Sequence, residues 1–258
     1  MSLWLEPISG FGVGLLVGMT GVGGGSLMTP LLTLLLGYTA PVAVGTDLAF
    51  AAITKSFGTA AHRSHGHVKW AIVKRLTFGA LPAALVTILA LKRLGGIEAG
   101  ALHAIKLTIA VSVLLTVLSL LFRARLLSAL RAHPAWQLHG RHQAAATVFV
   151  GAVIGVLVTV SSIGAGAVGA TLILLLYPEL EPAEVAGTDI AYAVPLTAMA
   201  ALGHIWLNTV HWTLLGSLLI GSLPGIWLGA KLTRHLPERI VRGALAATLT
   251  LAAVKLVA

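Results

Sequence analysis

Residues 20–30 read T-G-V-G-G-G-S-L-M-T-P, with four glycines among the five residues 21–25. Glycine destabilises the interior of a helix, so this stretch predicts a break in the backbone. The runs on either side, 8–19 and 31–36, are nevertheless as apolar as lipid. Broken backbone at membrane depth is tolerated only where protein or a water-filled cavity satisfies its polar groups. We therefore interpret the stretch as an interruption between two short, membrane-embedded helices.

A second glycine-rich break lies in the other half of the chain. There, residues 161–171 read S-S-I-G-A-G-A-V-G-A-T between apolar runs at 144–160 and 172–177. Two breaks in corresponding places are the sequence pattern of a transporter's binding site. A simpler interpretation of each stretch is close helix packing, because small residues let membrane helices approach one another. The repetition and the short flanking runs favour the break.

Composition places the chain in a membrane. Of its 258 residues, 57% are apolar and 10% are charged, whereas a soluble domain carries roughly 25% charged residues. Apolar runs of about 20 residues recur along the chain, as membrane-spanning helices require. The net charge of +9 comes mostly from short loops, where it orients the protein in the bilayer, so no nucleic-acid partner is expected. The absence of cysteine excludes thiolate metal sites and a cysteine nucleophile.

The apolar pattern predicts two sets of helices, each a broken pair followed by three membrane-spanning helices. The first set is expected at 8–19, 26–36, 42–62, 70–91 and 102–122, and the second at 144–160, 167–177, 182–207, 212–232 and 237–257. The chain then divides into a first transmembrane repeat (1–122), a basic cytoplasmic loop (123–142) and a second transmembrane repeat (143–258).

The two halves are a duplication. G-T-D-L-A-F at 45–50 matches G-T-D-I-A-Y at 187–192, an offset of 142 (187 minus 45), and the same offset pairs 79–82 with 221–224. Each repeat is expected to cross the membrane three times, and an odd number of crossings inverts the second copy. Inversion also gathers most basic loops on the cytoplasmic side. The predicted fold is an all-α integral membrane protein with two inverted repeats, each containing a Gly-broken re-entrant helix pair, and with both termini outside.

Inverted repeats bring the two breaks together near the midplane, where each starts a new helix. The first N–H groups of a helix have no intrahelical partner and carry partial positive charge, so two such ends favour a small anion. Thr29 and Ser162 would add hydroxyl donors. The predicted substrate-binding residues at and around these ends are Gly23, Gly24, Gly25, Ser26, Thr46, Gly164, Ala165, Gly166 and Thr188.

Lys55 is predicted as a further substrate-binding residue, because it lies inside the apolar helix expected at 42–62. A lysine there costs several kcal/mol unless it is paired, hydrated or extended to an interface. The lysine would therefore contact the anion or compensate its charge, and the alternatives are a snorkelling lysine or one paired with Asp47. Pairing with Asp47 is unfavourable, because eight residues place the two about 80° apart around a helix. The repeat mate of Lys55 is Thr197, so this positive charge has no symmetric counterpart.

Asp47 and Asp189, the only aspartates, are repeat mates and predicted proton-coupling groups. The simpler interpretation of each is an N-cap of its own helix. A carboxylate beside the cavity would instead couple proton and anion movement. His62 and His204, also repeat mates, are further proton-coupling candidates. No metal, cofactor or catalytic residue is predicted, because no histidine cluster has a nearby carboxylate or a matched nucleophile.

The chain resembles the sulfite exporter TauE/SafE family, also called the toluene sulfonate uptake permease family. The resemblance rests on G-V-G-G-G-S-L-M-T-P at 21–30, A-V-G-T at 43–46, G-H-V-K-W at 66–70 and G-A-L-P at 79–82, with their second copies. The family often has serine where this chain has Asp47 and Asp189.

The resemblance implies a multi-pass permease of the cell inner membrane that moves sulfite, sulfonates or related anions. The expected function is a secondary transporter of small sulfur-containing or organic anions, coupled to protons and working by alternating access, and not an enzyme. The alternative is a passive channel or a carrier of H⁺, Na⁺ or metal ions that uses Asp47 and Asp189. The expected partners are the anion and the lipid bilayer, and a homodimer is left open.

Overall fold

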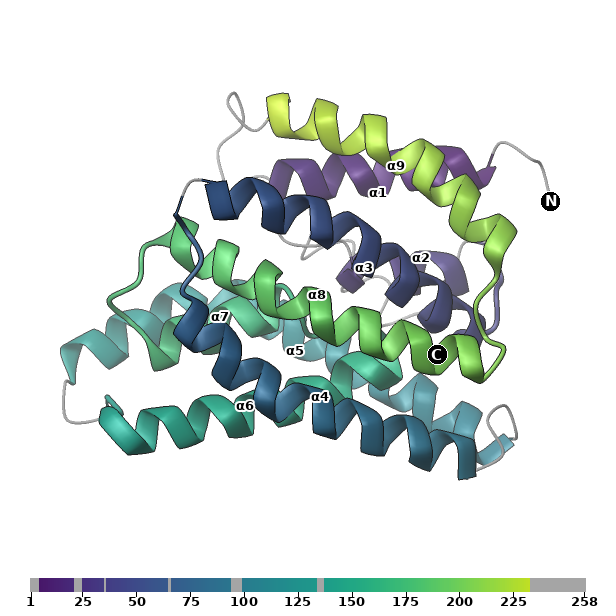
Figure 1. Ribbon diagram of the computed structural model, residues 1–258. Coiled ribbons are helices and arrows are strands. Elements are labelled where there is room, and N and C mark those ends of the chain that lie inside the picture. The colour runs from purple at the N-terminus through teal and green to yellow at the C-terminus, as the bar shows by residue number, and fades with distance from the viewer. Residues whose placement is uncertain are drawn as a thin grey trace.

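The computed structural model describes residues 5–20, 25–34, 36–64, 66–93, 99–133 and 137–232. These residues form helices joined by short connections, and none of them lies in a strand, which confirms the predicted all-α class (Figure 1). In chain order the helices are α1 (Leu5–Thr20), α2 (Gly25–Leu34), α3 (Ala40–Ser64), α4 (Trp70–Arg93), α5 (Ala99–Ala132), α6 (Gly140–Ser161), α7 (Ala167–Leu176), α8 (Pro182–Trp206) and α9 (Trp212–Leu232).

Several helices have the length and composition of membrane spans. Within the described residues these are Trp70–Arg93, Ile105–Ala132, Gly140–Ser161, Pro182–Trp206 and Trp212–Gly229. Large apolar side chains such as Phe57, Phe78, Phe149 and Ile220 are exposed on the outer faces of the helices. An apolar exterior on long apolar helices is what a lipid environment requires. The chain is an integral membrane protein.

Both broken pairs fold back on themselves. In the second pair, the Gln143 side chain at the start of α6 donates to the Leu176 carbonyl at the end of α7 (2.7 Å). In the first pair, the Tyr38 hydroxyl just beyond α2 donates to Glu6 in the first turn of α1 (2.6 Å). The end of each short helix thus returns to the side on which its pair begins, as a re-entrant pair requires.

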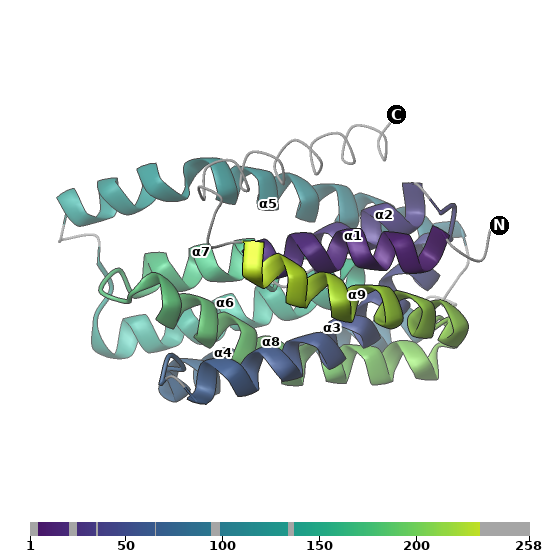
Figure 2. The same ribbon diagram turned by 90° about the horizontal axis from the view of Figure 1, so that it is seen from above.

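The first helix of each repeat packs closely on a helix of the other repeat. Helix α6 lies along α4, and α1 lies along α9 (Figures 1 and 2). A Cβ added at Gly79 of α4 would overlap the Val148 carbonyl of α6, and one added at Gly221 of α9 would overlap the Pro7 carbonyl of α1. Gly79 and Gly221 are repeat mates, so the same small residue makes the same close approach twice.

The central helices α3 and α8 are repeat mates that run antiparallel (Figure 1). Near the start of α3, the Thr46 hydroxyl oxygen accepts the backbone N–H of His211, which follows the end of α8 (3.0 Å). Near the start of α8, the Thr188 hydroxyl oxygen accepts the backbone N–H of Lys69, which follows the end of α3 (3.0 Å). Antiparallel repeat mates with reciprocal contacts are the arrangement that inverted repeats predict.

The loop expected at 123–142 is shorter than predicted, because α5 continues through Ala132 and α6 starts at Gly140. Residues 123–132 read R-A-R-L-L-S-A-L-R-A, and arginine, alanine and leucine are all good helix formers. The polar residues at 123–132 interrupt the apolar pattern, but they do not end the helix. The helix expected at 237–257 lies outside the described residues.

Candidate functional site

The second break is a buried, irregular connection between α6 and α7. Ser162 adopts a left-handed conformation with φ of 58°, and Gly164 and Gly166 have φ of 132° and 142°. The latter two angles lie in a region that favours glycine, so these residues make the break possible. The connection is buried throughout, and its backbone polar groups therefore need partners inside the protein.

Lys55 supplies one of these partners from the other repeat. Its ammonium group donates to the Ala165 carbonyl at 3.0 Å, and its side chain is only 5% exposed. The lysine therefore points into the protein toward the second break, rather than out to an interface. A buried ammonium beside broken backbone is the positive charge expected at this position, although it comes from α3 rather than from the break itself.

Asp47 is fully buried and is the eighth residue of α3, so the simpler interpretation, an N-cap of its own helix, is wrong. Its Oδ2 atom accepts a hydrogen bond from the Thr29 hydroxyl of α2 at 2.6 Å, which ties α3 to the first re-entrant pair. Its Oδ1 atom has no hydrogen-bond partner among the described residues, and neither does the Ser162 hydroxyl. Ser162 lies close enough to interact with the carboxylate, but the two atoms do not have hydrogen-bond geometry.

Asp189 occupies the equivalent place in α8, and it does not cap its own helix either. The backbone N–H of Gly166, which precedes α7, lies close enough to its carboxylate to interact with it electrostatically. Its Oδ1 atom is buried without a hydrogen-bond partner among the described residues, as is the Tyr192 hydroxyl. A Cβ at Gly169 would overlap Asp189 Oδ1 and lie 2.8 Å from the Tyr192 hydroxyl, so both oxygens face the same glycine of α7.

Tyr192 was not among the predicted site residues. It follows Asp189 by three positions on the same helix, a spacing that puts two side chains on one helix face. That spacing could have identified it from the sequence.

Charges from both repeats influence one another here, although the Lys55 ammonium forms an ion pair with neither aspartate. The Lys55 ammonium interacts electrostatically with both Asp47 and Asp189, and all three side chains are at most 5% exposed. We call the group of Asp47, Lys55, Ser162, Asp189 and Tyr192 the central cluster. Burying charged and polar groups is costly unless they are paired or hydrogen-bonded, so the unpartnered oxygens of the central cluster are unusual.

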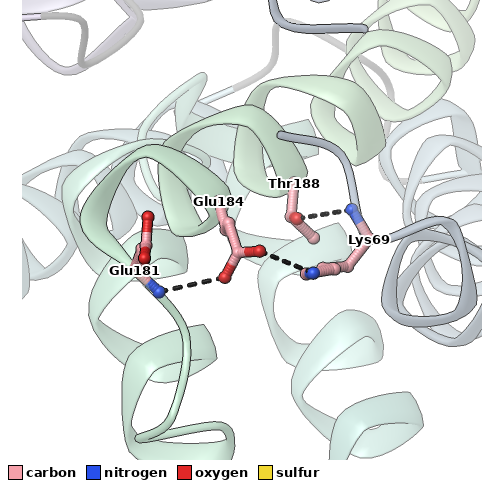
Figure 3. A network of polar contacts seen from close by, with 4 residues as sticks. All are labelled: Lys69, Glu181, Glu184 and Thr188. Atoms are coloured by element: carbon pink, nitrogen blue, oxygen red, sulfur yellow. Dashed lines mark hydrogen bonds and ion pairs between the residues drawn. The ribbon is translucent and has the colours of Figure 1, made fainter. Parts of the chain in front are cut away.

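The hydrogen bonds of the Thr46 and Thr188 hydroxyl groups go to loops outside the central cluster. Each hydroxyl oxygen accepts a backbone N–H of a loop in the other repeat, as described above. Figure 3 shows the backbone N–H of Lys69 donating to the Thr188 hydroxyl oxygen, and the Lys69 ammonium paired with Glu184, which lies in α8 with Thr188. The Glu184 carboxylate also accepts the backbone N–H of Glu181. These contacts hold the two repeats together, and a role of Thr46 and Thr188 in substrate binding stays a prediction.

His204 is held at both ring nitrogens. Its Nε2 atom lies 2.9 Å from the Thr159 carbonyl of α6, and its Nδ1 atom lies 2.8 Å from the Thr209 hydroxyl. Since a carbonyl only accepts, Nε2 carries a proton. These contacts join the end of α8 to α6, and proton coupling through His204 stays a prediction.

The residues predicted from the first break are only partly described. Gly25 and Ser26 begin α2, whereas Gly23 and Gly24 lie outside the described residues. The backbone of His62 belongs to α3, and its side chain also lies outside the description.

A helical membrane bundle with two re-entrant pairs and a buried charged centre has the architecture of a membrane transporter. The profile of the family described as "Sulfite exporter TauE/SafE" matches residues 7–256. This chain belongs to that family, and the resemblance found in its motifs is confirmed.

Two relatives from Bacillus subtilis (strain 168) are similar over most of their length. "Probable membrane transporter protein YjnA" is 34% identical over 251 residues, which cover 97% of this chain and 98% of the relative. "Probable membrane transporter protein YdhB" is 27% identical over 239 residues, which cover 91% and 92%. No solved structure matches the chain. The family and these relatives are membrane transporters rather than enzymes, and so is this chain.

Proposed function

We propose that this protein carries a small sulfur-containing or organic anion, such as sulfite or an organosulfonate, across the cell inner membrane. Transport is coupled to protons and proceeds by alternating access. The substrate binds at the central cluster, where the two re-entrant pairs approach each other. The family description, which names sulfite export, supports the substrate class.

The observation that carries the proposal is the buried ammonium of Lys55 beside the second break. An ammonium has three donors, and Ala165 uses one of them. The start of α7 adds the partial positive charge of a helix N-terminus, and Ser162 adds a buried hydroxyl without a hydrogen-bond partner among the described residues. Together these groups offer an anion both charge and hydrogen-bond donors.

The two aspartates supply the reason for proton coupling. Asp47 bonds to Thr29 of one re-entrant pair, and Asp189 interacts electrostatically with the backbone N–H at the start of α7 in the other. Carboxylates at these positions compete with an incoming anion for the same donors. Protonation removes their charge, so an anion is expected to enter together with protons.

The test is anion flux into liposomes that contain the purified protein. We expect sulfite uptake driven by a pH gradient, with loss of uptake in Lys55→Ala and loss of the pH dependence in Asp47→Asn and Asp189→Asn. Lys106→Ala, which changes an exposed lysine of α5, is the matched control and should transport normally. A thermal-shift screen against sulfite, sulfate, thiosulfate, sulfoacetate and taurine would identify the substrate.

The unpartnered Oδ1 atoms of Asp47 and Asp189 favour one alternative, a carrier of H⁺, Na⁺ or metal ions. Flux of Na⁺ or a metal ion that does not depend on any anion would replace the proposed function with this one.

A further inference from the structure

The connection between the second re-entrant pair and α8 is held by basic side chains that precede the second repeat. Residues 177–181 join the end of α7 to the start of α8. The Arg75 guanidinium of α4 donates to the Tyr177 hydroxyl (3.1 Å), and the Arg131 guanidinium of α5 donates to the Pro178 carbonyl (2.9 Å). These two bonds attach α4 and α5 to neighbouring residues of the connection.

Lys69 adds an ion pair to the same part of the molecule (Figure 3). Its ammonium pairs with Glu184 in the first turn of α8, and its backbone N–H donates to the Thr188 hydroxyl oxygen one turn later (3.0 Å). Glu184 also accepts the backbone N–H of Glu181, as the third helical residue of a capping box does. We call Lys69, Arg75 and Arg131 the basic clamp, and the face on which they lie the clamp face.

The ionic part of the clamp has no counterpart on the opposite face. At the offset of 142 (211 minus 69), the repeat mates of Lys69, Arg75 and Glu184 are His211, Ser217 and Val42. The Val42 side chain cannot form an ion pair, and the Ser217 hydroxyl donates to the Thr213 carbonyl of its own helix (3.0 Å). The duplication therefore kept the fold of the two faces and changed their charges.

The opposite face keeps a contact through the backbone. The His211 N–H donates to the Thr46 hydroxyl oxygen as the Lys69 N–H donates to Thr188, and the His211 ring packs against the Tyr38 ring (centroids 5.8 Å apart). The two faces thus share one hydrogen bond between the repeats, and the ion pair distinguishes them.

We propose that the basic clamp is a one-sided latch, which favours the state of the transport cycle in which the clamp face is closed. The inference rests on the proposed function, because alternating access supplies the two states. Lys69 and Glu184 belong to different repeats, so a rocking of one repeat against the other separates them. A contact that is made in only one state shifts the equilibrium toward that state.

The size of the shift follows from the exposure of the ion pair. The Lys69 and Glu184 side chains are 42% and 21% exposed, so solvent screens their attraction. Pairs of this kind shift an equilibrium by about two- to fivefold. The clamp therefore biases the cycle without locking it.

The experiment uses the absence of cysteine from the chain, because one introduced cysteine then reports on one face. Val68 is 8% exposed and lies beside Lys69, and Val210 is its repeat mate on the opposite face. The measurement is the rate at which a water-soluble maleimide labels Val68→Cys or Val210→Cys in the full chain in detergent.

Glu184→Gln removes the ion pair but keeps a side-chain acceptor for the Glu181 N–H, so the start of α8 stays capped. We expect it to raise the labelling rate of Val68→Cys about two- to fivefold and to lower that of Val210→Cys. Lys69→Gln removes the same pair from its other end and should give the same two changes. Lys74→Gln, which changes an exposed lysine of α4, is the matched control and should change neither rate.

A mirror variant tests the direction of the bias. Val42→Glu combined with His211→Lys places the two partners of the ion pair at the equivalent positions of the opposite face. It should lower the labelling rate of Val68→Cys, since the opposite face would then be held closed.

The decisive rate is that of Val210→Cys, because a local loosening around Glu184 would act on the clamp face alone. If Glu184→Gln and Lys69→Gln leave this rate unchanged, the inference is overturned, even where Val68→Cys is labelled faster. Anion flux in liposomes with unchanged labelling would leave the proposed function standing without the latch. Opposite changes of the two rates without anion flux would contradict the proposed substrate and leave the latch standing.

Discussion

Close packing between the repeats gives a sharp prediction at Gly221, where α9 meets α1. A Cβ in Gly221→Ala would lie 2.9 Å from the Phe11 nitrogen and would overlap the Pro7 carbonyl oxygen. Both are backbone atoms of a helix, so they cannot rotate away as a flexible side chain would. The helices must separate to accommodate one methyl group.

The size of the effect follows from a comparison within α9. At Gly216 of the same helix, an added Cβ meets nothing within 4 Å, so Gly216→Ala is the matched control. Both substitutions gain about 1 kcal/mol of helix propensity, and this gain cancels between them. Overpacking a tight contact costs about 1–3 kcal/mol, and backbone overlap places Gly221→Ala near the upper end. A difference of about 3 kcal/mol corresponds to unfolding midpoints roughly 6–12 °C apart.

The assay is thermal unfolding of both variants in one detergent at one heating rate. The unfolding midpoint of Gly221→Ala should be well below that of Gly216→Ala. Gly79 of α4 is the repeat mate of Gly221, so Gly79→Ala should lower the midpoint in the same way. In Gly79→Ala the Cβ would lie 2.9 Å from the Ala152 nitrogen. Equal midpoints for Gly221→Ala and Gly216→Ala would refute the close approach of α1 and α9.

Two further predictions concern the re-entrant pairs. Thr29→Val removes the 2.6 Å hydrogen bond to the Asp47 carboxylate and should cost about 1.5–3 kcal/mol of stability, measured as a lower unfolding midpoint. Thr33→Val, whose hydroxyl donates within its own helix, should change the midpoint much less, and equal losses would contradict the role of the bond. Burial, and then the bond to Glu6 and its charge, raise the pKa of Tyr38 to about 12. Because the pKa of Tyr38 is higher in the folded than in the unfolded protein, where it is about 10, the neutral side chain stabilises the fold at pH values below about 10. This stabilisation is lost as the pH rises from about 10 to about 12. The stability advantage of the wild type over Tyr38→Phe should therefore disappear across that range, and a constant difference would contradict it.

The helices and the duplication could be predicted from the sequence because both depend on local patterns. Apolar length predicts spans, and the offset between 45–50 and 187–192 predicts the repeat. The end of α5 could not be predicted in this way. Residues 123–132 lose the apolar pattern but keep helix-forming residues, so hydropathy and helix propensity disagree there.

The charged members of the central cluster could be singled out from the sequence, because Lys55, Asp47 and Asp189 are rare charges within apolar helices. Their partners were not. Nothing in the local sequence indicates that Asp47 bonds to Thr29, or that the hydroxyl oxygens of Thr46 and Thr188 accept backbone N–H groups of distant loops.

The sequence by itself determined that the chain is a duplicated helical membrane protein, since hydrophobic length and glycine-rich interruptions act over a few turns of backbone. Only the tertiary structure decided which polar groups meet. Lys55 reaches the Ala165 carbonyl across 110 residues, and this contact exists because the two repeats pack against each other. Burial in that packing removes water as an alternative partner, so the fold, rather than the local chain, selects the contacts of the charged centre.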